Sequence, residues 1–283
     1  MSIPAQQSEE WLKMRKNKVG ASDAPVIMGV SPWKTPYQLW LEKVSSHIQD
    51  QKSEAMQRGL DLEEEARSTF EQMTGLTVIP LVVLHDEYDW MMASLDGIDI
   101  EKKAIVELKC PNKIDHQMAV SGKIPEKYFP QLQHQIAVCK VDKAYYFSYN
   151  GREGAIVQIY RDDKYIKQLI EKERHFYDCV QTFNAPEANE RDYNIIDEEE
   201  TCFLASKILE TKKMIKNLEK QESIMMEDFM KRCEFRNTQG NNFKLTKSVR
   251  KGSVDYSSIP QLLGVDTEKY RKPTVEAWRL TNG

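Results

Sequence analysis

The chain has 283 residues and a formal net charge of −4, with 30% of its residues charged. Its length suffices for one sizeable buried core plus an additional segment, and no apolar run approaches the roughly 18 residues of a membrane-spanning helix. The acidic total means that any binding to nucleic acid requires a local basic face.

The N-terminal region predicts two short helices. Residues 8–17 read as a helix capped by Ser8, with two glutamates in its first turn. Thr35-Pro36 predicts the start of the second helix, because proline is favoured in a first turn. At the end of the first helix, residues 11–18 carry Lys13, Arg15, Lys16 and Lys18 with no acid among them, which is either a phosphate-binding face or a solvated helix surface.

A longer helix is predicted over residues 54–74, followed by Gly75 as its C-terminal stop. Its apolar stripe contains Glu63. A carboxylate in such a stripe either pairs or binds metal, or it lies at the edge and reaches water. We expect Arg67 nearer the other side of the helix.

Four strands are predicted next, at about residues 77–84, 90–95, 97–100 and 104–110. Asp96 is expected to end the second of them at a turn marked by Asp-Gly. Glu107 and Lys109 share one side of the last strand because strand side chains alternate. Two carboxylates suit a hard divalent cation, and an ammonium beside them suits phosphodiester hydrolysis. The alternative is a solvated strand face with a weak ion pair.

A helix is predicted over residues 128–140, starting near Pro130, with Gln131 and Gln135 on one face. These amides either orient a phosphate or a water, or belong to an ordinary polar surface. Strands at 144–149 and 155–160 flank the hairpin signal Asn150-Gly151, and a helix follows from 163 to about 183. The pattern predicts an α/β (α+β) fold, with a mixed central sheet flanked by helices on both faces.

Residues 185–198 are polar and acidic and predict a linker. A heptad seam then runs from Leu204 to Phe229, and it either folds back on the core or pairs with another chain. Strand-like pieces at 243–246 and 275–280, with a hairpin tip at 237–242, complete a C-terminal helical and β appendage.

Isolated residue types add constraints. The five cysteines form no Cys-x-x-Cys pair, which argues against zinc and against an iron–sulfur cluster. His134 is expected at the surface. Trp11, Trp33 and Trp40 are expected in the core or a pocket wall, with one of them able to stack on an end base.

Several short motifs together resemble the YqaJ-type viral recombinase nucleases, the family of phage lambda exonuclease within the PD-(D/E)xK nuclease superfamily. The resemblance covers about residues 9–180. Its motifs lie, in order, at residues 10–15, 20–23, 58–67, 93–97, 107–111 and 130–133. Leu95-Asp96 replaces the usual proline–aspartate pair, which leaves the metal-binding acid intact.

The resemblance implies specific roles for eight side chains. Asp96, Glu107 and the Leu108 carbonyl would bind Mg²⁺, with Mn²⁺ as a substitute. The implied catalytic residues are Glu63, which would complete the metal site through a water, Asp96, Glu107, Lys109 and Gln131. The implied residues for the 5′-phosphate of a DNA end are Arg15, Ser22 and Ser94.

The resemblance also implies a metal-dependent exonuclease that digests linear double-stranded DNA from 5′ ends (5′→3′) to give single strands for phage-type recombination. The resemblance implies a phage- or prophage-encoded protein in a bacterial cell, and we expect it in the cytoplasm because residues 1–7 show no targeting signal. The expected partners are double-stranded DNA ends, a single-strand annealing protein and further copies in a trimer ring. The alternatives are a structure-specific endonuclease or nickase, and a non-catalytic DNA-end or recombinase-binding module.

The expected domains are a restriction-endonuclease-like core at 1–184, the linker at 185–198 and the appendage at 199–283.

Overall fold

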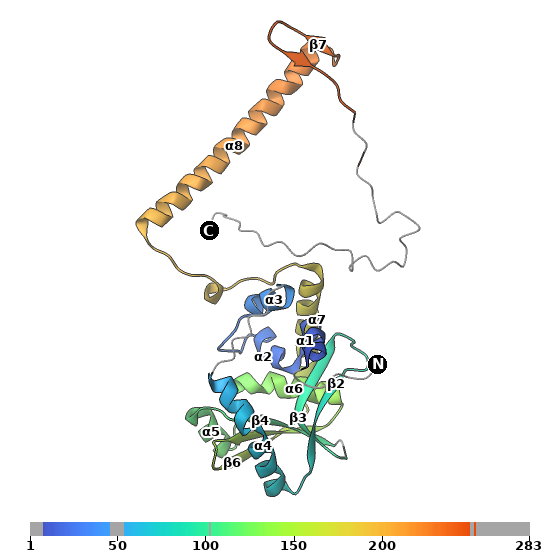
Figure 1. The fold of residues 1–283 in the computed structure, drawn as a ribbon, viewed down its shortest axis with the longest axis vertical. Coiled ribbons are helices and arrows are strands. Elements are labelled where there is room, and N and C mark those ends of the chain that lie inside the picture. Colours follow the sequence, from blue (N-terminus) through green and yellow to red (C-terminus); the bar gives the residue numbers. More distant parts are fainter. Residues whose placement is uncertain (1–7, 46–53, 102, 250–251, 253–283) are drawn as a thin grey trace. The chain divides into compact units, whose positions relative to one another are not determined.

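A computed structural model describes residues 8–45, 54–101, 103–249 and 252 (Figure 1). The chain divides into two compact units, Met1–Tyr193 and Asn194–Gly283. Within the described ranges, no helix combines the length and apolar character needed to span a membrane.

The first unit contains seven α-helices among its described residues. The helices are α1 (Glu9–Lys16), α2 (Ala24–Ile27), α3 (Pro36–Val44), α4 (Glu54–Thr74), α5 (Lys113–Val120), α6 (Phe129–Cys139) and α7 (Asp163–Thr182), with short 3₁₀ turns η1 (Ala21–Asp23), η2 (Glu126–Tyr128) and η3 (Glu190–Asp192). Helix α4 has the bounds predicted for the long helix. The Ser8 hydroxyl accepts from the Trp11 amide, as predicted for a capping residue. Helix α3 begins at Pro36 as predicted, and Thr35 caps it together with Gln38. Gly75 has φ +72°, which fits its role as the stop of α4.

The strands form one mixed sheet. They are β1 (Val19–Gly20), β2 (Val78–Leu84), β3 (Met91–Asp99), β4 (Ala104–Lys109), β5 (Lys143–Tyr149) and β6 (Gly154–Tyr160). β3 pairs antiparallel with β2 and β4 and parallel with β1, β4 pairs parallel with β5, and β5 and β6 form the predicted hairpin. The sheet order places β3 and β4 side by side at its centre.

The predicted turn at Asp96-Gly97 is wrong, because β3 continues through it to Asp99. A side chain at Gly97 would place its Cβ 2.7 Å from Val106 Cγ1 and 2.8 Å from Val78 Cγ2. The glycine therefore allows the neighbouring strands to approach closely, and does not mark a chain reversal. Asp96 lies within a central strand.

Helices cover both faces of the sheet, as predicted. On one face, Ala66 and Phe70 of α4 pack against Val106, Leu108 and other buried side chains of the sheet. On the other face, α6 and α7 contribute to the larger core with Leu132, Ile136 and Phe176. The two faces of β4 are therefore different, and Glu107 lies on the α6 side.

His134 and Trp33 differ from expectation. His134 is fully buried on α6, where Nδ1 lies 2.7 Å from Glu173 Oε1 and Nε2 lies 2.9 Å from the Met92 carbonyl. Because both ring nitrogens have hydrogen-bond partners inside the core, the His134 side chain needs no contact with water. Trp33, expected in the core or a pocket wall, is 67% exposed.

Part of the segment predicted as a linker packs on the first unit. Arg191 donates to the Ser31 and Pro32 carbonyls at 3.1 and 2.9 Å, and the Thr35 hydroxyl donates to Asp192. Through these contacts, residues 191 and 192 near the C-terminal end of the first unit hold the loop that precedes α3.

The second unit consists of the long helix α8 (Glu199–Arg232) and a hairpin of β7 (Thr238–Gln239) and β8 (Lys244–Leu245). The hairpin was predicted at 237–242, whereas the strand-like piece at 275–280 lies outside the described residues. None of the α8 residues is buried, and its seam residues Leu204, Ile215 and Leu218 are each at least half exposed.

Candidate active site

Glu107 on β4 lies at the centre of a buried polar cluster. Its side chain is 3% exposed, and its carboxylate accepts hydrogen bonds from Lys109, Gln131 and Gln135. Gln131 donates over 2.5 Å from the first turn of α6, and Gln135 follows one turn later on the same face. The pairing of Gln131 with Glu107 joins two residues that the sequence assigned to one site.

Asp96 on β3 is the second acid of the cluster. Its Oδ2 accepts from the Leu108 amide over 2.9 Å, which fixes the carboxylate beside β4. Shielding from solvent, followed by the nearby Glu107 carboxylate, raises the pKa of Asp96 to about 8. Two carboxylates held this close repel each other, and a cation relieves that repulsion.

Lys109 is the cation that the chain itself supplies. Its side chain is 27% exposed and pairs with Glu107, and its ammonium lies 5.6 Å from the centre of the Tyr128 ring. Burial lowers the pKa of Lys109, but the Glu107 and Asp96 carboxylates outweigh burial and raise it overall. Lys109 is therefore a charged ammonium at the solvent-facing edge of the cluster.

Glu63 on α4 lies beside this cluster but pairs with Arg67. The two side chains are 30% and 20% exposed, and Arg67 Nη2 donates to Glu63 Oε1 over 2.6 Å. Arg67 Nε also donates to the Asp96 carbonyl over 3.1 Å. The predicted position of Arg67 nearer the other side of α4 is wrong, because residues four apart on a helix share a face.

The donor set fits a hard divalent cation. Asp96, Glu107 and the Leu108 carbonyl are oxygen donors, and Mg²⁺ binds through one or two carboxylates while keeping several waters. Gln135 Oε1 is buried without a hydrogen-bond partner beside Glu107, which leaves an additional oxygen for a bound water. In the described part of the chain, no group of three His, Cys, Asp or Glu side chains forms a ready metal cluster, and Glu63 is paired with Arg67.

A second cluster joins the residues predicted for the 5′-phosphate. Arg15 Nη2 donates to the Ser22 hydroxyl over 2.7 Å, and Trp11 Nε1 donates to the Ser94 hydroxyl over 2.9 Å. The Arg15 guanidinium lies over the Trp11 ring at 5.2 Å from its centre. Ser94 precedes Asp96 by two residues on β3, so this strand connects the two clusters.

The basic run around Arg15 is tied down by other bonds. Lys16 donates to the Ser45 carbonyl and Lys18 to the Asp89 carbonyl. Lys43 of α3 is almost fully buried, where it pairs with Asp23 at 2.8 Å and donates to the Arg15 carbonyl over 3.1 Å. Two of the four predicted basic residues thus bond to the backbone, while Arg15 keeps its guanidinium beside Ser22.

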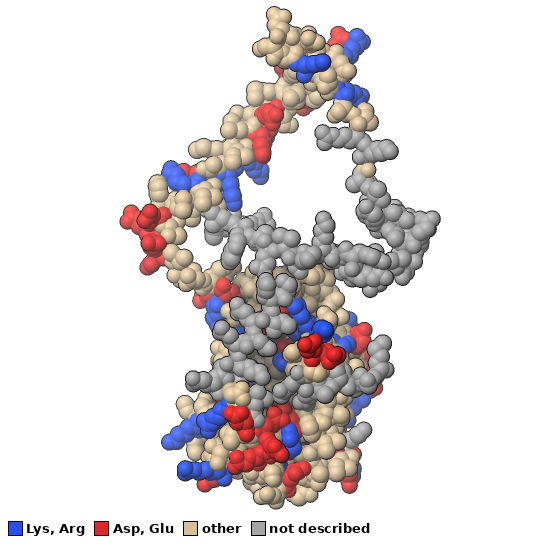
Figure 2. Space-filling view, viewed as in Figure 1, with Lys and Arg blue, Asp and Glu red and all other residues tan. Residues whose placement is uncertain are grey.

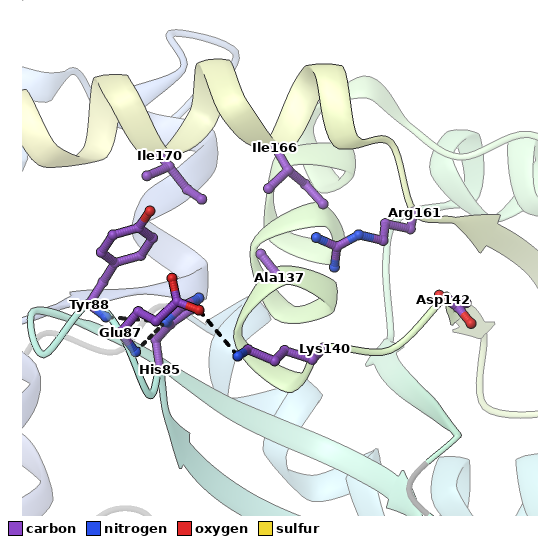
Figure 3. A pocket seen from close by; sticks show the side chains of 9 residues that line it. All are labelled: His85, Glu87, Tyr88, Ala137, Lys140, Asp142, Arg161, Ile166 and Ile170. Carbon is purple, nitrogen blue, oxygen red and sulfur yellow. Dashed lines mark hydrogen bonds and ion pairs between the residues drawn. The ribbon is translucent and has the colours of Figure 1, made fainter.

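A pocket of about 400 Å³ lies away from these clusters (Figure 3). Lys140 and His85 approach it from the C-terminal end of α6 and the end of β2, whereas Gln131 lies at the opposite end of α6. Lys140 is paired with Asp86 and Glu87. Acidic and basic side chains both reach the face of the first unit seen in Figure 2. Neither this pocket nor the mixed charge of that face is a better candidate for the active site than the cluster around Glu107.

The fold and the polar cluster agree with the expectation from the sequence. A mixed central sheet with helices on both faces carries two acids and a lysine on adjacent central strands. This is the arrangement that the resemblance to the PD-(D/E)xK nucleases implies. Residues 10–142 match the model of the YqaJ-like viral recombinase domain. The resemblance seen in the sequence is confirmed.

Two relatives match part of the chain. The uncharacterized protein YqaJ of Bacillus subtilis (strain 168) is 33% identical over 175 residues, which is 60% of this chain and 55% of the relative. The uncharacterized protein R354 of Acanthamoeba polyphaga mimivirus is 27% identical over 153 residues, covering 49% of this chain and 28% of the relative. The chain therefore spans about half of the first relative and less of the second.

Solved structures share the fold. The alkaline exonuclease LHK-Exo from Laribacter hongkongensis is 27% identical, with a TM-score of 0.55 over 62% of this chain and 94% of that one. The structure of LHK-Exo in complex with dAMP gives 28% identity and a TM-score of 0.56, with the same coverage.

Three contributing residues were missed or undervalued in the sequence. Gln135 was recognised only as sharing a face with Gln131, and that four-residue spacing was the signal that it would lie beside the same partner as Gln131. Arg67 could have been found from its four-residue spacing to Glu63. Lys43 carries no local signal, because its partners Asp23 and Arg15 are distant in sequence.

Proposed function

We propose that the first unit is a metal-dependent DNA exonuclease that digests linear double-stranded DNA from its 5′ ends. The observation that carries this proposal is the Asp96, Glu107 and Lys109 cluster on adjacent central strands, with Glu107 fixed by two glutamines. The likeness to an alkaline exonuclease at 27% identity supports it.

Each residue of the cluster has a role in phosphodiester hydrolysis. Asp96, Glu107 and the Leu108 carbonyl would hold Mg²⁺, or Mn²⁺ in its place, with Glu63 acting through a water. Such an ion polarises the phosphate and lowers the pKa of a bound water. Lys109 stabilises the negative charge that develops on the attacked phosphate. Gln131 and Gln135 keep the Glu107 carboxylate oriented without adding charge.

The second cluster, of Arg15, Ser22 and Ser94, supports the proposed 5′→3′ direction. Arg15, Ser22 and Ser94 would bind the terminal 5′-phosphate, since a guanidinium and hydroxyl groups donate directly to phosphate oxygens. Because Ser94 and Asp96 lie on one strand, the terminal phosphate and the scissile phosphate would be held at a fixed separation. This arrangement favours removal of nucleotides from a phosphorylated 5′ end.

Assembly and biological setting extend the proposal. The family resemblance favours a trimer ring threaded by DNA, in the bacterial cytoplasm and encoded by a phage or prophage, producing single strands for recombination. The exposed seam on α8 would strengthen that ring or dock a single-strand annealing protein. Light scattering of the full chain and of a truncation near residue 185 tests the ring. A monomeric mass for both would contradict it.

The activity is tested by comparing three DNA substrates in Mg²⁺. These are a linear duplex with a 5′-phosphate, the same duplex with a 5′-hydroxyl, and closed circular DNA, each with and without EDTA. We expect nucleotide release from the phosphorylated linear duplex, slower release from the hydroxyl form, and neither cutting of the circle nor activity in EDTA. Rapid cutting of the circle would replace the exonuclease by an endonuclease or nickase.

A further inference from the structure

Trp33 is a large aromatic side chain that projects from the first unit into solvent. It is 67% exposed, although it follows the buried Ser31 and precedes the buried Thr35. A single exposed apolar residue is common on protein surfaces. Three further observations distinguish Trp33 from such a residue.

The first observation is that its loop is held rigidly. The Val30 and Ser31 amides both donate to the Pro25 carbonyl, and the Ser31 hydroxyl accepts from the Trp33 amide over 3.3 Å. The Arg191 guanidinium donates to the Ser31 and Pro32 carbonyls. The exposed indole is therefore presented by an ordered loop, so a ligand that binds it loses little additional chain entropy.

The second observation is a cation beside the ring. Lys127 Nζ lies 4.7 Å from the centre of the Trp33 ring, and it pairs with the Asp115 carboxylate at 2.6 Å. A cation over an indole ring is a favourable contact that fixes the ring's orientation. Because most of the side chain is still exposed, aromatic surface remains open to a flat ligand.

The third observation is that the indole is linked to the candidate active site. Lys127 Nζ lies 5.3 Å from the centre of the Tyr128 ring, and Lys109 Nζ lies 5.6 Å from the centre of the same ring. Trp33 is thus separated from Lys109 by one lysine and one tyrosine. If a phosphate of the DNA lies at Lys109, the indole of Trp33 is a flat aromatic surface close to the base attached to that phosphate.

We propose that Trp33 is a stacking platform for an unpaired base of the strand being cut, at the end of the DNA substrate. The inference rests on the proposed nuclease function, which supplies the phosphate at Lys109. Stacking on an indole tolerates any base, because each base has a π face, so this subsite adds affinity for frayed ends without sequence preference. An exonuclease that must separate the terminal pair gains from holding the released base.

The test uses a short 5′-phosphorylated duplex whose 5′-terminal base is an unpaired 2-aminopurine, in a Ca²⁺ buffer. Binding is followed by the fluorescence of 2-aminopurine, which is quenched on stacking, for the full-length parent and for Trp33→Ala and Trp33→Phe. Tyr160→Ala is the matched control, because Tyr160 is an exposed aromatic of the same unit at the end of β6. A duplex closed by hairpins at both ends shows whether the effect requires an unpaired end.

We expect Trp33→Ala to weaken binding of the unpaired end by about 5- to 150-fold and to lose the quenching, because one base stack contributes about that much. Trp33→Phe should retain part of both, and Tyr160→Ala should match the parent. The hairpin-closed duplex should bind the parent and Trp33→Ala equally.

Unchanged binding in Trp33→Ala would overturn the platform, and it is also the result expected if Trp33 contacts a partner protein. An equal loss for the hairpin-closed duplex, or for Tyr160→Ala, would overturn it as well. Cleavage by the parent protein distinguishes failure of the Trp33 platform from failure of the proposed nuclease function. A parent that digests linear duplex while Trp33→Ala binds normally refutes only the platform, whereas a parent that neither binds nor cuts DNA refutes the nuclease function.

Discussion

Replacing Lys43 by methionine should strongly destabilise the first unit. Lys43 and Asp23 side chains are 7% and 6% exposed and pair at 2.8 Å, and Lys43 also donates to the Arg15 and Lys18 carbonyls. Methionine fills a similar volume but leaves the Asp23 carboxylate buried without its cation. Breaking such a pair costs about 3–5 kcal/mol of unfolding free energy.

Thermal unfolding provides the assay. For a unit of this size, 1 kcal/mol shifts Tm by about 2–4 °C, so Lys43→Met should lower Tm by about 6–20 °C. Lys34→Met is the matched control, because Lys34 pairs with Glu42 at the surface with 34% and 55% of the side chains exposed. An exposed pair contributes about 0–1 kcal/mol, so the control should change little.

The pH dependence tests the physical reason. Burial opposes ionisation of Asp23, but Lys43 and Arg15 hold its pKa below the usual value. Stability from this group is therefore present above the unfolded pKa and is lost as pH falls through the folded pKa. In Lys43→Met the pKa of Asp23 should rise, so the deficit relative to the parent should shrink in acid. Adding Asp23→Asn should recover stability. Equal Tm values for Lys43→Met and Lys34→Met would refute the reasoning.

Three other predictions concern the core, the DNA end and the metal. Burial lowers the pKa of His134, but Glu173 outweighs it and raises the pKa overall, while burial raises the pKa of Glu173. Both shifts make the folded state bind more protons than the unfolded chain, so the unfolding free energy should fall as pH rises above the ordinary pKa values of the two groups, and Glu173→Gln should flatten that slope in urea titrations. Arg15→Ala should reduce the preference for 5′-phosphorylated over 5′-hydroxyl ends more than it reduces metal binding; an unchanged preference ratio in cleavage assays would assign the end to another group. Asp96→Asn should abolish the heat of Mg²⁺ binding in calorimetry, and full binding by that variant would remove Asp96 from the metal site.

Local patterns in the sequence predicted most of the fold. The cap at Ser8, the helix start at Thr35-Pro36 and the stop at Gly75 are local signals. The helices predicted at 8–17 and 54–74 have the predicted bounds within one residue, and α3 begins where predicted. Asp96-Gly97 led to the wrong prediction of a turn. The glycine is needed because the side chains of Val78 and Val106 on the two neighbouring strands leave no room for a Cβ at residue 97. Local sequence does not contain that information.

The same distinction applies to the candidate site. Glu107 and Lys109 could be paired from strand alternation, whereas Gln131 was assigned to the site only through the family resemblance. The burial of His134 could not be anticipated, because its partners Glu173 and the Met92 carbonyl come from elements far along the chain. The exposure of Trp33 depends likewise on Arg191, which holds its loop from outside the local sequence.

Nucleotide release by Lys109→Ala, measured together with duplex binding, tests hydrolysis at the Asp96–Glu107–Lys109 cluster most directly. Lys103→Ala is the matched control, because Lys103 is an exposed lysine that precedes β4 and pairs with Glu101. Single-turnover release from 5′-phosphorylated linear duplex in Mg²⁺ should fall by about 10²–10³-fold or more in Lys109→Ala, with binding still measurable, and should be unchanged in Lys103→Ala. Near-full turnover by Lys109→Ala would contradict this mechanism.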